Sequence, residues 1–161
     1  MNQLTLDATD LQILKILQND GGISNLELAD QISLSPTPCS RRVKRLQDAG
    51  YFRGKVTLVS QEAVGLPVTV FLQITLSRQK RQKLDHFESV VSAWPEVMEI
   101  YLMTGDFDYL LRAVSPSLEA FHNFLKKLTE IEEINHIKSS FALKQVRYST
   151  ALPLDHLVNA R

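Results

Sequence analysis

The sequence predicts an α+β protein with an N-terminal helix-turn-helix (winged-helix-like) domain and a C-terminal βαββαβ domain of the ferredoxin-like class. Two observations support this fold class: apolar residues first recur with a helical period, and the period changes to two from Val68 onward. A composition of 44% hydrophobic and 22% charged residues is typical of a folded globular protein. We expect a helix-turn-helix domain over residues 1–60, a linker over residues 61–67 and a second domain over residues 68–161.

The first two helices are predicted by apolar spacing and by capping residues. Apolar positions over residues 7–19 have helical spacing, and Asp7 or Asp10 can cap the first turn. A pair of glycines then breaks the pattern. Ser24 and Glu27, three residues apart, form the sequence signature of a capping box, so a short second helix is expected to begin here.

A third helix follows a tight turn. Ser35 is its expected N-cap and Pro36 occupies the favoured first helical position. The helix is expected to run to about Asp48, before Gly50 stops it. Residues 51–60 are rich in aromatic and β-branched side chains, which predicts a short strand or wing.

The second domain begins with a strand over residues 68–76, in which apolar and other residues alternate. A helix that Pro95 ends is expected to follow, because one helical face carries Leu84, Phe87, Val91 and Trp94.

A hairpin, a second helix and a last strand complete this domain. The two hairpin strands and the last strand are expected over residues 97–103, 109–114 and 135–148. Ser115 is the expected cap of the second helix and Pro116 its first residue. Its apolar stripe comprises Leu118, Phe121, Leu125 and Leu128.

A sheet with both helices on one face leaves its other face without a cover. Phe71, Tyr101 and Phe141 are expected on that second face, where contact with water is costly. We therefore expect this domain to associate with another copy of itself.

Charge is concentrated in one segment of an otherwise neutral chain. The protein has 18 basic and 18 acidic residues, yet residues 41–55 contain six basic residues and one acidic residue. Such a patch can contact phosphates while the whole molecule stays neutral. A solvated helix face is the simpler interpretation of the same charges.

The third helix separates an apolar edge from a polar one. On a helical wheel Cys39, Val43 and Leu46 lie together, and Thr37, Arg41, Lys44 and Asp48 fall between about 140° and 200° from Cys39. A helix, a short turn and a third helix with a basic outer edge are what a helix-turn-helix requires to enter the major groove of double-stranded DNA. Arginine can hold a guanine edge or a phosphate, lysine offers a point charge, and hydroxyl groups donate or accept. The candidate DNA-binding residues are Ser35, Thr37, Pro38, Ser40, Arg41, Arg42, Lys44 and Arg45.

The sequence runs also resemble one family over nearly the whole chain. LDATDLQIL and LELADQISLSPTPCSRRVKRLQDAG resemble the DNA-binding domain of Lrp/AsnC (leucine-responsive, feast/famine) transcription regulators, and LSPTPC with the basic residues after it is the most diagnostic run. WPEV, TGDFDYLLRA and SSFALKQVRYSTALPL are similar to the effector-sensing and oligomerisation (RAM) domain of that family.

This resemblance implies partners and a second site. Residues 35–45 would be the recognition segment, and the chain would form a homodimer through its β-rich domain and assemble further into a tetramer or octamer. An amino acid or similar effector would bind between dimers near Thr104, Gly105, Asp106, Phe107, Asp108, Ser139 and Ser140. Glycine permits close approach, carboxylates can answer an ammonium group, and hydroxyls can donate to a carboxylate. The simpler alternative is a hairpin turn with solvated acids.

Two positions depart from the family pattern. Phe107 stands where many members have tyrosine, and Ser40 occupies a variable position of the recognition helix. The operator sequence and the identity of the effector are therefore not transferable from the resemblance.

Other chemistry has little support in the sequence. Cys39 lies on the apolar edge of the third helix and is interpreted as a core residue. No metal site and no cofactor are expected, because the histidines at positions 86, 122, 136 and 156 lack partners at ligand spacing. No catalytic constellation supports an enzyme built on the ferredoxin-like domain. We expect a cytoplasmic protein, since apolar stretches fall short of the ~20 residues of a membrane span.

The predicted function is therefore a sequence-specific DNA-binding transcription regulator of the Lrp/AsnC type, modulated by an amino acid or similar small molecule. The alternative is an architectural, nucleoid-associated DNA-binding protein with little effector response. The sequence does not separate the two.

Overall fold

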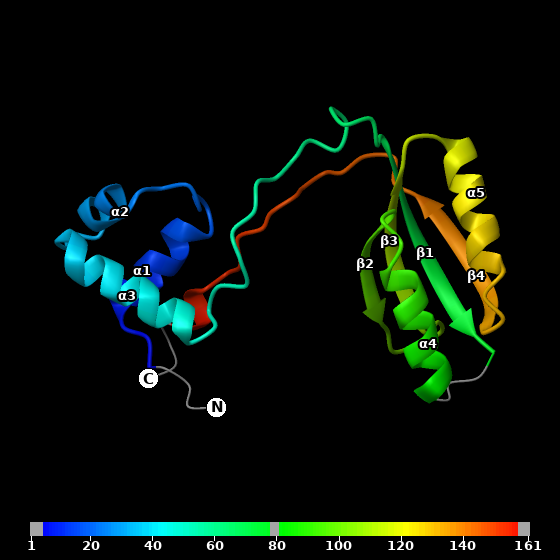
Figure 1. Ribbon diagram of the computed structural model, residues 1–161, viewed down its shortest axis with the longest axis horizontal. Coiled ribbons are helices and arrows are strands. Elements are labelled where there is room, and N and C mark those ends of the chain that lie inside the picture. Colours follow the sequence, from blue (N-terminus) through cyan, green and yellow to red (C-terminus); the bar gives the residue numbers. More distant parts are fainter. Residues whose placement is uncertain (1–4, 78–80, 158–161) are drawn as a thin grey trace. The chain divides into compact units, whose positions relative to one another are not determined.

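The computed structural model describes residues 5–77 and 81–157. These residues form two compact units (Figure 1). One unit comprises the residues up to Leu58 together with those from Arg147 onward, and the other comprises Val59–Val146. The C-terminal segment therefore belongs with the helical unit, whereas the sequence placed it in the second domain.

The helical unit contains α1 (Ala8–Leu17), α2 (Asn25–Gln31) and α3 (Pro36–Asp48), as predicted. Its apolar stripes meet in one core, whose buried side chains are Leu11, Ile13, Leu14, Leu28, Ala29, Ile32, Cys39 and Leu46. Burial raises the pKa of the Cys39 thiol, which agrees with its interpretation as a core residue.

The capping residues act largely as the sequence predicts. Asp7 caps α1 and Ser24 caps α2, each in a complete capping box. Ser35 occupies the N-cap of α3, but its side chain accepts no capping hydrogen bond, so the start of α3 depends on Pro36 at N1. Gly50, at φ 78°, ends the helix in the left-handed region that glycine adopts freely.

The strand expected over residues 51–60 is not formed in the single chain. The segment runs on without ladder pairing, and everything beyond its first two residues is exposed. Tyr51 and Phe52 pack against the helical core instead. A strand needs a neighbour to bond with, and no described segment supplies one here.

The second unit has the predicted βαββαβ order. Its strands are β1 (Val68–Leu76), β2 (Val97–Leu102), β3 (Tyr109–Ser115) and β4 (Ile134–Phe141), arranged as an antiparallel sheet in the order β2-β3-β1-β4. Helices α4 (Arg81–Ser92) and α5 (Leu118–Thr129) lie along this sheet (Figure 1). Helices and sheet share one core of Val70, Leu72, Ile74, Leu76, Phe87, Val91, Tyr109, Leu111, Ala113, Phe121, Phe124, Leu128 and Ile131.

Two helix boundaries of this unit differ from the prediction. The end of α4 tightens into i→i−3 hydrogen bonds at Ala93 and Trp94, so the helix stops before Pro95. Ser115 pairs with Val68 as the last residue of β3, and Ser117 caps α5 in its place. Two predicted stripe positions differ as well: Leu118 is exposed, and Trp94 packs on the core from beyond α4.

The last strand is shorter than expected because its partner begins late. β4 pairs with β1, where Val70 lies opposite Phe141 and the Ala142 amide still donates to Thr69. Since β1 begins at Val68, later residues have no partner, and residues 142–150 are all exposed.

The ladder register decides which side chains lie on the uncovered sheet face, called the outer face below. Phe71 lies opposite Arg112 and Ser140, and Tyr101 lies opposite Leu110. Phe71 and Tyr101 are 38% and 50% exposed, as expected for this face. The prediction for Phe141 is wrong, because it lies opposite buried Val70 and packs edge-on against Phe121 of α5, 5.1 Å between ring centres.

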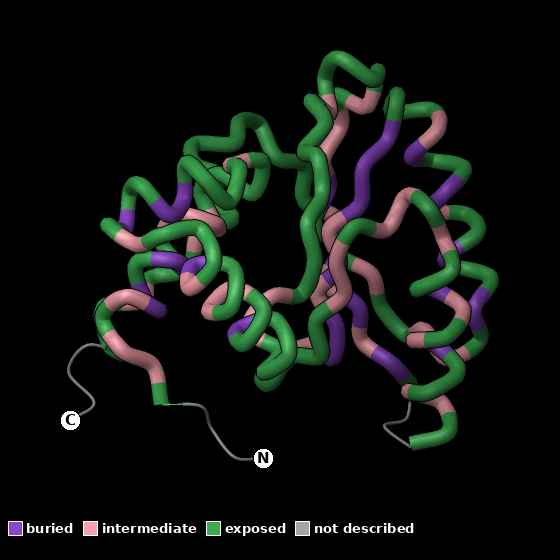
Figure 2. The backbone as a smooth tube through the Cα atoms, turned by 60° about the vertical axis from the view of Figure 1, so that its left-hand side comes forward, coloured by how far each residue is buried: buried purple, intermediate pink, exposed green. Residues whose placement is uncertain are grey.

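Buried residues lie in the helices, in the strands and in the turns next to them. Figure 2 shows buried residues along helices and strands, and residues 53–60 and 142–150 are exposed throughout. Within the described ranges no helix combines the length and apolar character needed to cross a bilayer.

Candidate nucleic-acid interface and effector site

Helix α3 presents a polar edge because its apolar edge is fixed in the helical core. Cys39 and Leu46 are fully buried there, which sets the rotation of the helix. Of the predicted DNA-binding residues, Pro38 and Arg42 are half-buried, and the exposed ones are Ser35, Thr37, Ser40, Arg41, Lys44 and Arg45.

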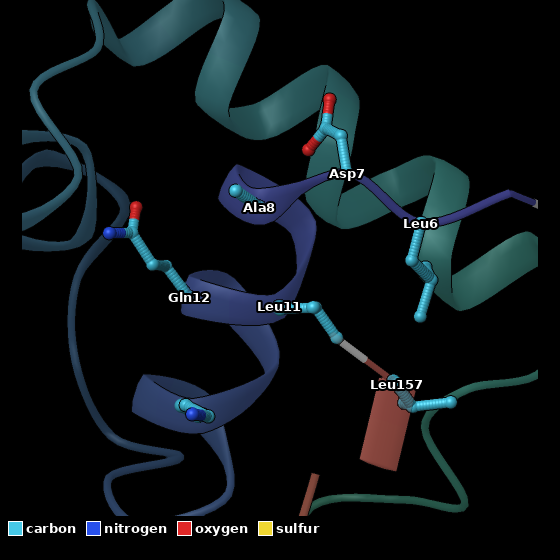
Figure 3. Close-up of a pocket in the computed structure, with 7 residues that line it drawn as sticks. Leu6, Asp7, Ala8, Leu11, Gln12 and Leu157 are labelled. Carbon is cyan, nitrogen blue, oxygen red and sulfur yellow. The ribbon is translucent and has the colours of Figure 1, made fainter. Parts of the chain in front are cut away.

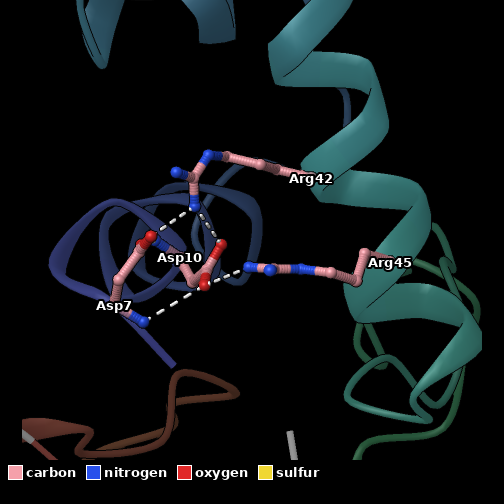
Figure 4. Close-up of polar contacts among 4 residues, drawn as sticks. All are labelled: Asp7, Asp10, Arg42 and Arg45. Carbon is pink, nitrogen blue, oxygen red and sulfur yellow. Dashed lines mark hydrogen bonds and ion pairs between the residues drawn. The ribbon is translucent and has the colours of Figure 1, made fainter. Parts of the chain in front are cut away.

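Two of the four basic residues of α3 are held by acids of α1 (Figure 4). Arg42 Nη1 donates to Asp7 Oδ2 at 2.6 Å and to Asp10 Oδ1 at 2.8 Å. Arg45 Nη2 donates to Asp10 Oδ2, which also accepts the Asp7 amide at 3.1 Å. The Asp10 side chain is fully buried, so both of its oxygens are satisfied inside the protein. We call these four residues the acid clamp.

The electrostatics of the clamp favour the charged forms of Asp7 and Arg42. Burial alone would raise the pKa of Asp7, but the Asp10 amide and the Arg42 guanidinium hold it below its ordinary value. The two carboxylates in turn raise the pKa of Arg42. Sequence reasoning assigned Asp7 and Asp10 to helix capping alone and missed their ion pairs with α3.

The other two basic residues of α3 remain available. No described residue pairs with Arg41. Lys44 makes only an exposed i,i+4 contact with Asp48, 3.4 Å between Nζ and Oδ2. A pair of this kind contributes little and gives way readily to a phosphate. Fewer basic residues of α3 are therefore free of ion pairs with buried or capping acids than the sequence suggests.

The hairpin turn of the second unit is open to solvent. Thr104, Gly105 and Asp106 are exposed, and Phe107 is half-buried. Gly105 has φ 116°, a conformation that side chains rarely adopt, and open space lies where a Cβ would point. The turn therefore requires glycine for its backbone geometry.

Asp108 has a structural contact instead of an open carboxylate. It is buried, and its Oδ2 accepts the Leu76 amide at 2.7 Å, at the end of β1. The expectation that the Asp108 carboxylate pairs with the ammonium group of a ligand is at odds with this burial. Asp106, by contrast, is exposed. Asp108 fixes where the turn meets the sheet.

Ser139 and Ser140 point to opposite sides of the sheet, because successive strand residues alternate. Ser140 lies opposite Phe71 on the outer face. Ser139 lies opposite buried Leu72 on the helix side, where it lines a shallow pocket of about 400 Å³ with Leu125, Thr129, Ile134, Asn135, His136 and Ile137. The two serines therefore cannot serve one site from the same face.

The outer face also carries a polar cluster that sequence reasoning missed. Arg112 Nε donates to Glu99 Oε1 at 2.7 Å, and the Tyr101 hydroxyl donates to Glu99 Oε2 at 2.7 Å. The hydrogen bond from Tyr101 lowers the pKa of Glu99 against the effect of burial, and Arg112 adds to it. Glu99 and Tyr101 share a face of β2, and the register of β2 with β3 brings Arg112 to them.

The C-terminal segment forms a second feature that sequence reasoning missed. Gln18, the C-cap residue of α1, exchanges two hydrogen bonds with the Leu152 backbone, both 2.9 Å, and Lys15 pairs with Asp155 at 2.8 Å. Leu154 packs on the helical core, and Leu157, in the 3₁₀ helix Asp155–Leu157, lines a pocket beside α1 (Figure 3). Leu154 and Leu157 are the sequence signal of this docking, since both are apolar residues near the end of the chain.

The candidate ligands for a metal ion are the histidine, cysteine and acidic side chains of the described residues. Within residues 5–77 and 81–157, no three histidine, cysteine or acidic side chains are placed to hold an ion.

A helix-turn-helix unit with a basic exposed helix edge, joined to a separate antiparallel α+β unit, defines a two-domain DNA-binding regulator. Comparison with known families agrees: residues 6–53 match a winged helix-turn-helix DNA-binding model, and residues 69–152 match the Lrp/AsnC ligand binding domain. The chain belongs to the Lrp/AsnC family of transcriptional regulators.

Relatives match nearly end to end. The leucine-responsive regulatory protein of Rhizobium meliloti (strain 1021) is 35% identical over 90% of this chain and 94% of its own length. The Bkd operon transcriptional regulator of Pseudomonas aeruginosa PAO1 is 41% identical over 92% of this chain and 98% of its own. A crystal structure of a transcriptional regulator from Neisseria meningitidis in complex with L-Met has a TM-score of 0.91 at 40% identity, covering 95% of this chain and 99% of that one.

Proposed function

We propose that this regulator binds double-stranded DNA through the exposed edge of α3, and that an amino acid bound by its second unit alters that binding. The observation that carries the DNA part is the exposed pair Arg41 and Lys44 on a helix whose rotation the core fixes. Support for the effector comes from the Neisseria relative, which was crystallised with L-Met.

The DNA-contacting edge follows from exposure and chemistry. Arg41 can hold a guanine edge with two hydrogen bonds, and Lys44 can neutralise a phosphate. Thr37 and Ser40 add short hydroxyl groups on the same exposed side. Ser35 and Pro38 lie in the first turn, where the positive end of the helix also favours a phosphate.

The effector site combines the hairpin turn with a second copy of the chain. Thr104, Gly105, Asp106 and Phe107 supply an open turn with one exposed carboxylate for an ammonium group. Of the two serines, Ser140 lies on the outer face and is the one available to a ligand held between copies. Asp108 supports the turn from inside.

Self-association gives the outer face a partner. Its exposed aromatic side chains, Phe71 and Tyr101, favour burial against another copy, so we propose a homodimer that assembles further into a tetramer or octamer in the cytoplasm. In such an assembly a ligand that binds one arrangement better than another shifts the population between them.

The effector is tested by a thermal-shift screen of the full chain against the twenty amino acids, with light scattering on every hit. Saturating ligand at about a hundredfold excess over its Kd stabilises the protein by about 2.7 kcal/mol. Gly105→Leu should abolish the shift, because leucine strains the turn and fills the space beside it, while the protein stays folded. A normal shift in this variant would contradict the assignment of the site.

A further inference from the structure

Two neighbouring cations of α3 have opposite surroundings. The Lys44 side chain is 76% exposed and meets only Asp48 on the surface. The Arg45 side chain is 45% exposed, and its guanidinium reaches the fully buried Asp10 (Figure 4). Adjacent residues of a helix point about 100° apart, so Arg45 reaches the acid of α1 while Lys44 stays on the exposed edge.

The buried carboxylate explains why Arg45 stays in place. Asp10 has three donors: Arg42, Arg45 and the Asp7 amide. A phosphate that attracted Arg45 would leave Asp10 Oδ2, on a fully buried side chain, with the Asp7 amide alone, which is costly for a charged group. Arg42 is held more firmly still, because it donates to both carboxylates.

We infer that Asp10 is a positioning residue for DNA recognition: it withholds Arg42 and Arg45 from phosphates and fixes how α3 presents Arg41 and Lys44. This inference rests on the proposed DNA binding and deepens it. Phosphate contacts carry no sequence information, whereas base contacts do. By limiting the number of phosphate contacts, the clamp lowers the affinity for bulk DNA and leaves a larger share of the binding to base recognition.

The salt dependence of the affinity for a non-specific duplex reports the number of phosphate contacts. Each contact adds about 0.9 to the slope of log affinity against log salt concentration. Lys44→Gln in the full chain should therefore lower the slope by about 0.9 for each recognition helix whose Lys44 contacts a phosphate. Arg45→Gln should leave the slope unchanged, and its amide can still donate to Asp10. The two substitutions remove the same charge from adjacent positions, so each is the control for the other.

Asp10→Asn is expected to act in the opposite direction. Arg45 loses the charged partner that holds it, whereas Arg42 keeps Asp7, so the slope should rise by about 0.9 for each Arg45 that finds a phosphate. Adding Arg45→Gln to Asp10→Asn should return the slope to the wild-type value. A loss of stability alone would not produce this rise and its reversal.

Two results overturn parts of this account and are distinguishable. Wild-type protein that binds no duplex at any salt concentration overturns the proposed DNA binding itself. Binding with an equal fall in slope for Lys44→Gln and Arg45→Gln overturns the withholding of Arg45 alone. Far-ultraviolet circular dichroism reports whether Asp10→Asn folds, and if it does not, the comparison of Lys44→Gln with Arg45→Gln decides.

Discussion

Arg41→Ala tests whether the exposed edge of α3 reads DNA sequence. Arg41 is exposed and makes no ion pair with a described residue, so its removal should change folding stability by less than about 0.5 kcal/mol. A two-bond contact with a guanine contributes about 1–3 kcal/mol, which corresponds to a roughly 5- to 150-fold loss of operator affinity. A phosphate contact alone would weaken all sequences equally and lower the salt slope by about 0.9.

The assay is fluorescence anisotropy with an operator selected from random sequence and with a shuffled duplex of the same composition. Arg81→Ala is the matched control, because Arg81 is a 94% exposed arginine in the other unit. Base reading predicts that Arg41→Ala narrows the ratio of operator to shuffled affinity while Arg81→Ala leaves it unchanged. An unaltered ratio for Arg41→Ala, with an intact fold, would refute the reasoning.

Three further predictions concern stability. The pKa of Asp7 is held below its ordinary value of 3.8, so its contribution to folding stability is complete above that pH and is lost as pH falls through the lowered value. When the free energy of unfolding is measured against pH in the acid range, Asp7→Asn should show a flatter curve than wild type. Coinciding curves would contradict this. Leu154→Ala should lower the melting temperature of the helical unit, since it removes about 1–2 kcal/mol of packing, whereas exposed Leu152→Ala should not; equal melting curves would disprove the docking. Asp108→Ala should cost about 1–3 kcal/mol in chemical denaturation because the buried Leu76 amide loses its acceptor, and a cost as small as that of exposed Asp106→Ala would exclude this role.

Local pattern was sufficient to predict most of the elements. The capping box of Ser24 and Glu27 spans three residues, so spacing alone predicted it, whereas the sequence left the cap of α1 open between Asp7 and Asp10. The alternation in β1 predicted its bounds at Val68 and Leu76 because every second side chain is buried. The wheel of α3 placed Cys39 correctly for the same reason.

Features that depend on distant partners were not predictable in this way. The clamp joins Asp10 to arginines more than thirty positions later in the chain, and no local period reports such a contact. The end of β4 depends on where β1 begins, and so does the face on which Phe141 lies. The family resemblance named the effector residues without their orientation. Separating Ser139 from Ser140, and Asp106 from buried Asp108, required the sheet register and burial.

The most direct test of the central claim measures binding of the full chain to its selected operator in competition with bulk DNA, with and without a saturating amino acid. A sequence-specific regulator should prefer the operator by about a thousandfold or more, and the effector should change that affinity or the number of copies bound. A preference close to unity that no amino acid alters would contradict the account and indicate an architectural DNA-binding protein.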